Sequence, residues 1–278
     1  MNYRGFTAQE LETEYSPSSM VGGDITPYLT AYRTLSAVQR DLLPVRENLQ
    51  FGPEDGNLLD FFPAIGGDAP LHVFIHGGYW QALSHRESSS MAGFITQTGS
   101  AFATLNYTLA PDARLGQMAK ECSDALVWLA SQRAELGFDA TRVTISGHSA
   151  GAHLASLVVS RFGTQLNAAG IEIENLILIS GIYDLEPIAQ TSINSALGLT
   201  STEIQDLSPM TDLPTAAKKV TVLVAQNDTA EFNRQSRDFA EALRKSGANV
   251  AFEQKRGMHH FDVILHASTF LPSEQNAP

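Results

Sequence analysis

Residues 144–156 read TISGHSAGAHLAS, and they place the pattern G-x-S-x-G, from Gly147 to Gly151, between a β-branched run and an amphipathic stretch. A serine held in a sharp turn from a strand into a helix is strained, and only small residues two positions before and after it avoid a clash. The same turn exposes the hydroxyl and directs the first free N–H groups of the helix toward it. The pattern therefore predicts that Ser149 is a nucleophile at the carboxyl end of a buried strand.

Short apolar runs alternate with longer amphipathic stretches along the rest of the chain. Such alternation is typical of βαβ units, and it predicts an α/β fold in which a mostly parallel central sheet has helices on both faces. Turn residues at 52–56 separate two extended runs in NLQFGPEDGNLLDFF (48–62), which predicts an antiparallel hairpin at one edge of the sheet. Strands are expected at 58–64, 71–76, 101–107, 142–147, 175–180, 220–226 and 250–254, and helices at 87–98, 116–136, 150–162, 231–246 and 261–270.

Length and composition indicate one domain that spans residues 1–278. Residues 1–45 are partly helical in pattern, and we expect them to form an N-terminal extension that packs on this domain. No apolar run approaches the roughly 18 residues that a membrane-spanning helix needs, and the first residues are too polar for a signal peptide. With Cys122 as its one cysteine, the chain can form neither an internal disulfide nor a cysteine metal site. A cytoplasmic protein is expected.

The charge balance narrows the class of partner. Asp and Glu number 30 against 18 Lys and Arg, which gives a net charge of −12, and no basic cluster occurs. Nucleic acids and anionic membranes both select clustered Lys and Arg, so neither is expected as a partner. The sequence favours a small-molecule substrate, and it is compatible with a homodimer.

A serine hydroxyl needs a base that takes its proton. In α/β-hydrolases the chain order is Ser, then Asp or Glu, then His. Asp228 ends a predicted strand in VLVAQNDTAEF, and His259 and His260 lie in KRGMHHFDVIL after the last one. Asp184, in ISGIYDLEP, is the rival acid because it too follows a strand, but it can also be explained as a helix cap or turn former, and Asp228 is favoured. His153 lies one turn into the helix after Ser149, and we interpret it as a packing residue.

The stretch HGGYW at 76–80 follows another buried strand. Acyl transfer needs preorganised N–H donors for a negative oxygen, one from the residue after the nucleophile and others from a glycine-rich loop after the third strand. The prediction is therefore an oxyanion hole made by Ala150 with Gly77, Gly78 and Tyr79. His76 is expected to brace the loop. Tyr79 and Trp80 add aromatic bulk beside it, and we expect both of them to contact the substrate.

Together HGGYWQ, GHSAGAHLA, SGIYDLEPI, EFNRQS and HHFDVI resemble the kynurenine formamidase (arylformamidase) family of the α/β-hydrolase superfamily, from about Glu10 to about Leu265. The resemblance implies cofactor-free hydrolysis of N-formylkynurenine to kynurenine and formate. It implies Ser149 as nucleophile, Asp228 as acid and His260 as base, because the histidine of the family directly precedes Phe-Asp or Phe-Glu. His259 is then the less favoured base.

Two other functions stay open at this point. A carboxylesterase that acts on small acyl or aryl esters would use the same residues, and NYTLAP (106–111) is similar to hormone-sensitive-lipase-type esterases. A binding protein on a hydrolase scaffold usually lacks a member of the triad, whereas all three members are present in this sequence. A metal-dependent hydrolase is not supported, since the sequence has no HExxH or HxH cluster.

Overall fold

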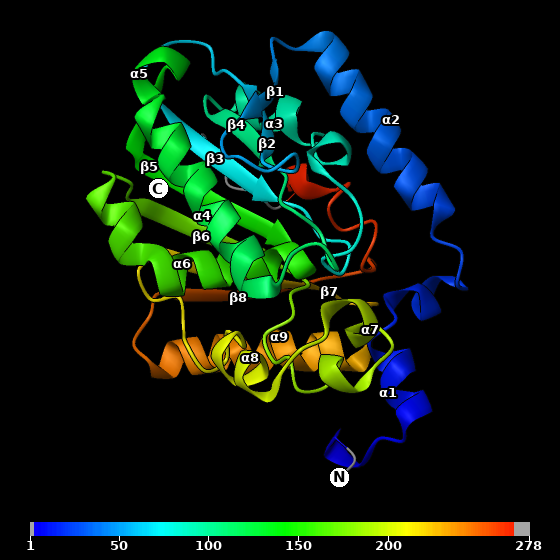
Figure 1. The fold of residues 1–278 in the computed structure, drawn as a ribbon. Helices are drawn as coiled ribbons and strands as arrows, with labels where there is room; N and C mark the ends of the chain where they lie inside the picture. Colours follow the sequence, from blue (N-terminus) through cyan, green and yellow to red (C-terminus); the bar gives the residue numbers. More distant parts are fainter. Residues whose placement is uncertain (1–2, 270–278) are drawn as a thin grey trace.

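A computed structural model describes residues 3–269, and its centre is an eight-stranded sheet (Figure 1). The strand order is β1-β2-β4-β3-β5-β6-β7-β8. β1 and β2 form the predicted antiparallel hairpin, β2 also pairs antiparallel with β4, and every other neighbouring pair is parallel. The strands are β1 (Arg46–Gln50), β2 (Leu58–Phe62), β3 (Ala69–Ile75), β4 (Ala101–Leu105), β5 (Phe138–His148), β6 (Ile173–Ile179), β7 (Lys219–Ala225) and β8 (Val250–Lys255).

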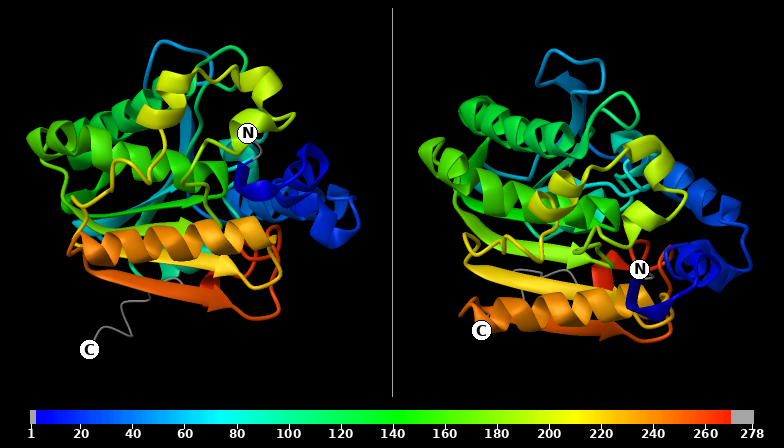
Figure 2. Two further views of the ribbon diagram at one scale, coloured as in Figure 1. Left: turned by 90° about the horizontal axis from the view of Figure 1, so that it is seen from below. Right: turned by 60° about the horizontal axis from the view of Figure 1, so that its bottom comes forward.

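Helices cover both faces of the sheet, which confirms the predicted fold class (Figure 2). The α-helices are α1 (Ala8–Glu14), α2 (Thr26–Leu42), α3 (Ala92–Gln97), α4 (Leu115–Ser131), α5 (Arg133–Leu136), α6 (Ala150–Ala168), α7 (Asn194–Leu197), α8 (Ser201–Asp206) and α9 (Ala230–Lys245). The 3-10 turns are η1 (Tyr3–Gly5), η2 (Pro17–Val21), η3 (His85–Glu87), η4 (Ile188–Gln190) and η5 (Ala267–Thr269).

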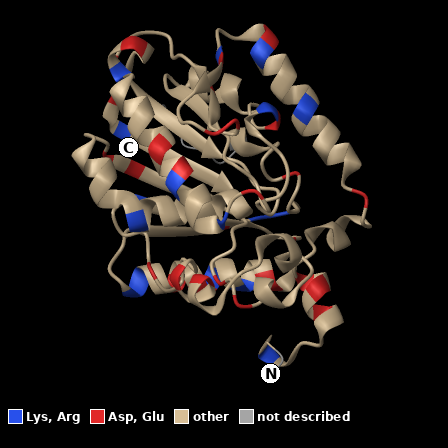
Figure 3. Ribbon diagram, viewed as in Figure 1, with Lys and Arg blue, Asp and Glu red and all other residues tan. Residues whose placement is uncertain are grey.

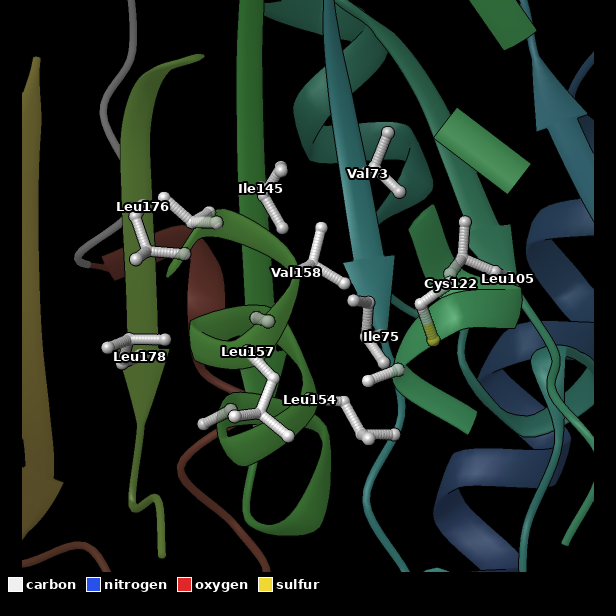
Figure 4. Close-up of a cluster of buried hydrophobic side chains, with 14 of the residues drawn as sticks. Val73, Ile75, Leu105, Cys122, Ile145, Leu154, Leu157, Val158, Leu176 and Leu178 are labelled. Carbon is white, nitrogen blue, oxygen red and sulfur yellow. The ribbon is translucent and has the colours of Figure 1, made fainter. Parts of the chain in front are cut away.

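Strand periodicity sorts the apolar side chains into two cores. Val73 and Ile75 of β3 lie in the larger cluster with residues of α4, α6 and α9, whereas Phe74 lies in the smaller cluster with residues of α2 and α3. Successive side chains of a strand point to opposite faces, so a continuous apolar run is what a sheet buried on both sides requires. Figure 4 shows the larger cluster, in which side chains of α6 meet those of β3, β5 and β6.

Three predicted helices differ from the structure, and one of them, at 116–136, is divided at Gln132 into α4 and α5. The stretch at 87–98 is helical only in α3, because Ser89 instead donates its N–H to the Ser36 hydroxyl (2.9 Å). The helix expected at 261–270 is wrong for the described part, residues 261–269, which form turns and the short η5. There Nδ1 of His259 accepts the N–H of Phe261 (3.2 Å), and the carbonyl of Phe261 accepts the Tyr32 hydroxyl (2.5 Å). The first of these bonds is local and the second is a tertiary contact with α2, and both compete with the hydrogen bonds of a helix.

Residues 3–45 lie on the side of the molecule toward which β3 and β5 point (Figure 1). α1 contacts α9, and α2 contacts η3. Between these contacts the N-terminal segment passes the carboxyl ends of the parallel strands, where open α/β sheets bind their ligands. Within residues 3–269, no helix combines the length and the apolar character that a membrane crossing requires.

Candidate active site

Ser149 lies between β5 and α6 with a backbone φ of 56° and ψ of −122°. The glycines on either side permit this turn, since a Cβ at Gly147 would lie 2.2 Å from the carbonyl oxygen of Gly151. A Cβ at Gly151 would lie 2.1 Å from that of Ile75. Real side chains do not tolerate such distances, so both positions need glycine. The local geometry is that of the strained strand-to-helix turn expected from the sequence.

Asp228 and His260 form a hydrogen-bonded pair. Nδ1 of His260 donates to Oδ2 of Asp228 at 2.8 Å, and the Asp228 side chain is fully buried. This bond leaves Nε2 as the ring nitrogen that can accept a proton. His260 and Ser149 line the same cavity, which therefore brings the predicted nucleophile and the predicted base together.

His148, directly before the nucleophile, supports His260. Its Nε2 donates to the backbone carbonyl of His260 at 2.9 Å, and the two ring centroids are 4.7 Å apart. Burial, reinforced by the neighbouring His260, lowers the pKa of His148 well below its usual range. His148, the second residue of the G-x-S-x-G pattern, is thus a neutral imidazole that holds the backbone of His260 in place.

The HGGYW loop approaches the nucleophile closely at Gly77. A Cβ there would lie 2.8 Å from the carbonyl oxygen of His148 and 3.0 Å from Cβ of Ser149. Among the described residues, 3–269, no backbone carbonyl or side chain accepts a hydrogen bond from the backbone N–H of Gly77, Gly78, Tyr79 or Ala150. Unbonded amides next to a nucleophilic serine are suitable donors for a developing oxyanion.

The two aromatic residues of this loop have different roles. Tyr79 lines the cavity, and its hydroxyl donates to the backbone carbonyl of Tyr15 at 2.5 Å. Trp80 is fully buried, packs edge-on against His153 at 5.0 Å, and is not among the described residues that line the cavity. The structure thus places the Trp80 side chain in the core, and it gives no support to the predicted contact of Trp80 with the substrate.

The other three candidate histidines contact groups outside the pair of Asp228 and His260. Nε2 of His153 donates to the carbonyl of Leu207 at 2.8 Å inside the core, as expected of a packing residue. His76 donates from Nδ1 to the carbonyl of Gly77 at 2.8 Å and so braces the loop; burial lowers its pKa to about 4. Nε2 of His259, the less favoured base, lies 3.2 Å from Oδ2 of Asp262.

Asp184, the rival acid, accepts the hydroxyl of Tyr3 at 3.0 Å. The SGIYDLEPI and EFNRQS stretches thus contribute to anchoring the N-terminal segment. Glu231 of the second stretch accepts the hydroxyl of Tyr15 at 3.0 Å, and Gln235 donates to that hydroxyl at 2.7 Å. No local sequence pattern indicates this anchor, because its bonded partners are more than 180 residues apart in the chain.

The cavity beside Ser149 has a volume of about 340 Å³. The sheet side contributes Ser149, His260 and the loop residues Gly78 and Tyr79. Much of the remaining wall comes from the N-terminal segment, through Glu12, Tyr15, Ser16, Pro17, Ser18, Ile25, Leu29 and Tyr32. A cavity of this size suits a small organic substrate.

Comparisons with known proteins agree with this geometry. A family model described as the alpha/beta hydrolase fold matches residues 72–263. Kynurenine formamidase of Danio rerio is 33% identical over 275 residues, covering 95% of this chain and 92% of that protein. The kynurenine formamidase of Drosophila melanogaster is 33% identical over 234 residues, covering 78% of this chain and 75% of that protein.

A solved structure of a candidate thioesterase from Silicibacter sp. TM1040 superposes with a TM-score of 0.83 at 27% identity, covering 96% of this chain and 97% of that one. The fold, the family model and the two kynurenine formamidases, which each match more than two thirds of the chain, agree with one another. The chain is a hydrolase of the serine type, and it belongs to the kynurenine formamidase family of the α/β-hydrolase superfamily.

Proposed function

We propose that this enzyme hydrolyses aryl formamides such as N-formylkynurenine, releasing formate and the aryl amine. The observation that carries the proposal is the 33% identity to a kynurenine formamidase over 95% of the chain. It is supported by the hydrogen-bonded pair of Asp228 and His260 beside a cavity that Ser149 also lines.

The proposed mechanism has two halves. Oγ of Ser149 attacks the formyl carbon while Nε2 of His260 takes the hydroxyl proton, and the N–H groups of Gly77, Gly78, Tyr79 and Ala150 stabilise the tetrahedral oxyanion. His260 then gives that proton to the leaving nitrogen, the C–N bond breaks, and the aryl amine departs from a formyl ester of Ser149.

In the second half His260 takes a proton from water, whose oxygen attacks the formyl ester. Collapse of the intermediate returns the proton to Oγ of Ser149 and releases formate. Asp228 keeps Nδ1 of His260 protonated throughout and stabilises the imidazolium that forms in each half.

A carboxylesterase activity is the second candidate. The esterase LipQ of Mycobacterium tuberculosis is 25% identical over 82% of this chain, so relatives with ester substrates exist alongside the formamidases. Both activities would use the same residues, and they differ in the acyl group and in the leaving group.

The test compares the two substrate classes on one preparation. We expect N-formylkynurenine and other formanilides to be hydrolysed faster than the matching acetanilides. Among p-nitrophenyl esters, short acyl chains should be preferred to octanoate, because each methylene that does not fit can cost about 1–3 kcal/mol. Equal or faster hydrolysis of octanoate, with formanilides untouched, would assign the chain to the esterases.

A further inference from the structure

Glu12 is a half-buried side chain of α1 that lines the same cavity as Ser149. Its carboxylate accepts the backbone N–H of Ser192 at 2.9 Å, and it also accepts the hydroxyl of Ser192. Each carboxylate oxygen can accept more than one hydrogen bond, so these two contacts fix the orientation of Glu12 and leave acceptor capacity for a ligand.

Glu12 supplies the cavity with its permanent charge. Among the described residues that line the cavity, no other is an Asp, Glu, Lys or Arg. None of the ion pairs within residues 3–269 includes Glu12. α1 carries acidic residues and no Lys or Arg (Figure 3).

The other two glutamates of α1, Glu10 and Glu14, bond to groups outside the cavity. Glu10 closes the capping box of the helix with Thr7, and Glu14 accepts the N–H of Glu231 at 2.9 Å. Neither lines the cavity. Of the three carboxylates on α1, Glu12 is therefore the one placed to meet a substrate.

The charge of Glu12 reaches the loop that follows β3. Burial raises the pKa of Tyr79 well above its usual range, and the negative charges of Asp228 and then Glu12 raise that pKa further. No Lys or Arg is among the described residues that line the cavity, so its negative field disfavours a bound anion and favours a bound cation. The strongest contact that a carboxylate makes with an organic cation is a charge-assisted hydrogen bond.

We propose that Glu12 is a specificity-determining residue that binds a primary ammonium group on the leaving amine. The preferred substrate class is then an aryl formamide whose aryl group carries an ammonium-bearing side chain. The ammonium would donate to the carboxylate of Glu12 while Ser149 attacks the formyl carbon. The identity of the cleaved bond rests on the proposed function, whereas the charge preference rests on the cavity alone.

The test measures kcat/KM of Glu12→Gln on three formanilides: N-formylkynurenine, its analogue without the amino group, and unsubstituted formanilide. We expect a loss of about tenfold on N-formylkynurenine, the size of one charge-assisted hydrogen bond at a partly exposed site. Formanilide should change by less than about twofold, and the analogue that keeps only the carboxylate should be hydrolysed faster, because a repulsive charge has been removed.

Glu10→Gln is the matched control. It removes the same charge from the same helix, and glutamine preserves a capping box, so it should leave all three rates unchanged. Equal losses on all three substrates in Glu12→Gln would show that Glu12 only ties α1 to Ser192 and would overturn the proposal. Unchanged rates on all three would overturn it as well.

A pair of esters separates this proposal from the proposed function. If the wild-type enzyme hydrolyses no formanilide, the proposed function fails, and the charge preference is measured on the acetate esters of tyramine and 4-ethylphenol. A loss of about tenfold confined to the tyramine ester in Glu12→Gln would support the ammonium site on its own. Parallel rates on the two esters in both proteins would overturn it.

Discussion

Asp228 and Asp184 show how single residues with the same position in the pattern acquire different roles. Each follows a parallel strand, yet Asp228 bonds to His260 whereas Asp184 bonds to Tyr3. We expect Asp228→Asn to lower kcat by about 10⁴, since an asparagine favours the wrong tautomer of the histidine. Asp184→Asn should leave kcat within about threefold, because the bond it disturbs is worth about 1 kcal/mol and lies in the anchor of the N-terminal segment. Steady-state kinetics with melting curves of both variants test this, and the reverse order would identify Asp184 as the acid.

Gly77 offers a second test at the scale of one residue. An alanine there would place Cβ 2.8 Å from the carbonyl oxygen of His148 and 3.0 Å from Cβ of Ser149. The loop must therefore shift, and the proposed oxyanion donors move with it. The loss of one such donor costs about 10²–10³ in kcat, so Gly77→Ala should lose about that much. Gly67→Ala, where a Cβ meets nothing within 4 Å, is the control. Equal activity of the two variants would show that close approach at Gly77 is not needed.

The residues of the acid–base pair could be predicted because each has a local signal, a polar side chain just after a buried strand. The positions of the Trp80 and Glu12 side chains, by contrast, have no local signal in the sequence. Trp80 shares the loop of the oxyanion donors, but the direction of its side chain depends on His153, which lies on another element. In the sequence, Glu12 is one of three glutamates in a short polar helical stretch. The positions of these glutamates do not indicate that α1 lies beside the cavity.

At the scale of elements, the N-terminal segment and the HGGYW loop form one unit. The Tyr79 hydroxyl donates to the carbonyl of Tyr15, and the hydroxyl of Thr229, next to the acid, donates to the carbonyl of Glu14 at 2.6 Å. Tyr79 has a φ of 51°, which a tyrosine adopts only when its surroundings hold it there. Residues 14 and 15 thus connect the loop of the proposed oxyanion donors to the loop of Asp228, the proposed acid.

Removal of one of these bonds should disturb both loops. Tyr79→Phe loses a bond worth about 1 kcal/mol, so we expect about a fivefold lower kcat and faster hydrogen exchange at residues 11–18. Tyr3→Phe removes the hydroxyl that donates to Asp184 and accepts from Arg234 at the other end of the anchor, and it should speed exchange near η1 without changing kcat. A normal kcat for Tyr79→Phe would mean that the packing of the loop holds the donors without the Tyr15 contact.

The sequence predicted the strands more closely than the helices, for a physical reason. A buried strand such as β6 or β7 is a short apolar run that is visible by itself. The helix expected after β8 is replaced by turns, because Tyr32 from the distant α2 bonds to the carbonyl of Phe261. Such tertiary contacts override local helical propensity, and no local pattern reveals them.

At the scale of the whole molecule, the fold buries several histidines in neutral form. Burial lowers the pKa of His72 to about 3 and those of His76 and His153 to about 4, from an ordinary value of 6.5. In the unfolded chain these imidazoles take up protons as the pH falls below about 6.5, whereas in the folded chain they stay neutral. The unfolded state then binds more protons, so the free energy of unfolding decreases as the pH falls from about 6.5 toward 4.

We therefore expect the free energy of unfolding to fall steeply between pH 6.5 and 4.5, by about 1.4 kcal/mol per pH unit for each buried histidine that stays neutral. Asp139, whose pKa Arg142 lowers to about 2, contributes to acid unfolding only below about pH 4, so the two effects occupy separate ranges. Urea titrations across this range measure the slope. His153→Gln can still donate to the carbonyl of Leu207 but cannot titrate, and it should reduce the slope by about one proton. A free energy of unfolding that stays constant from pH 7 to 5 would contradict the neutral burial of these histidines.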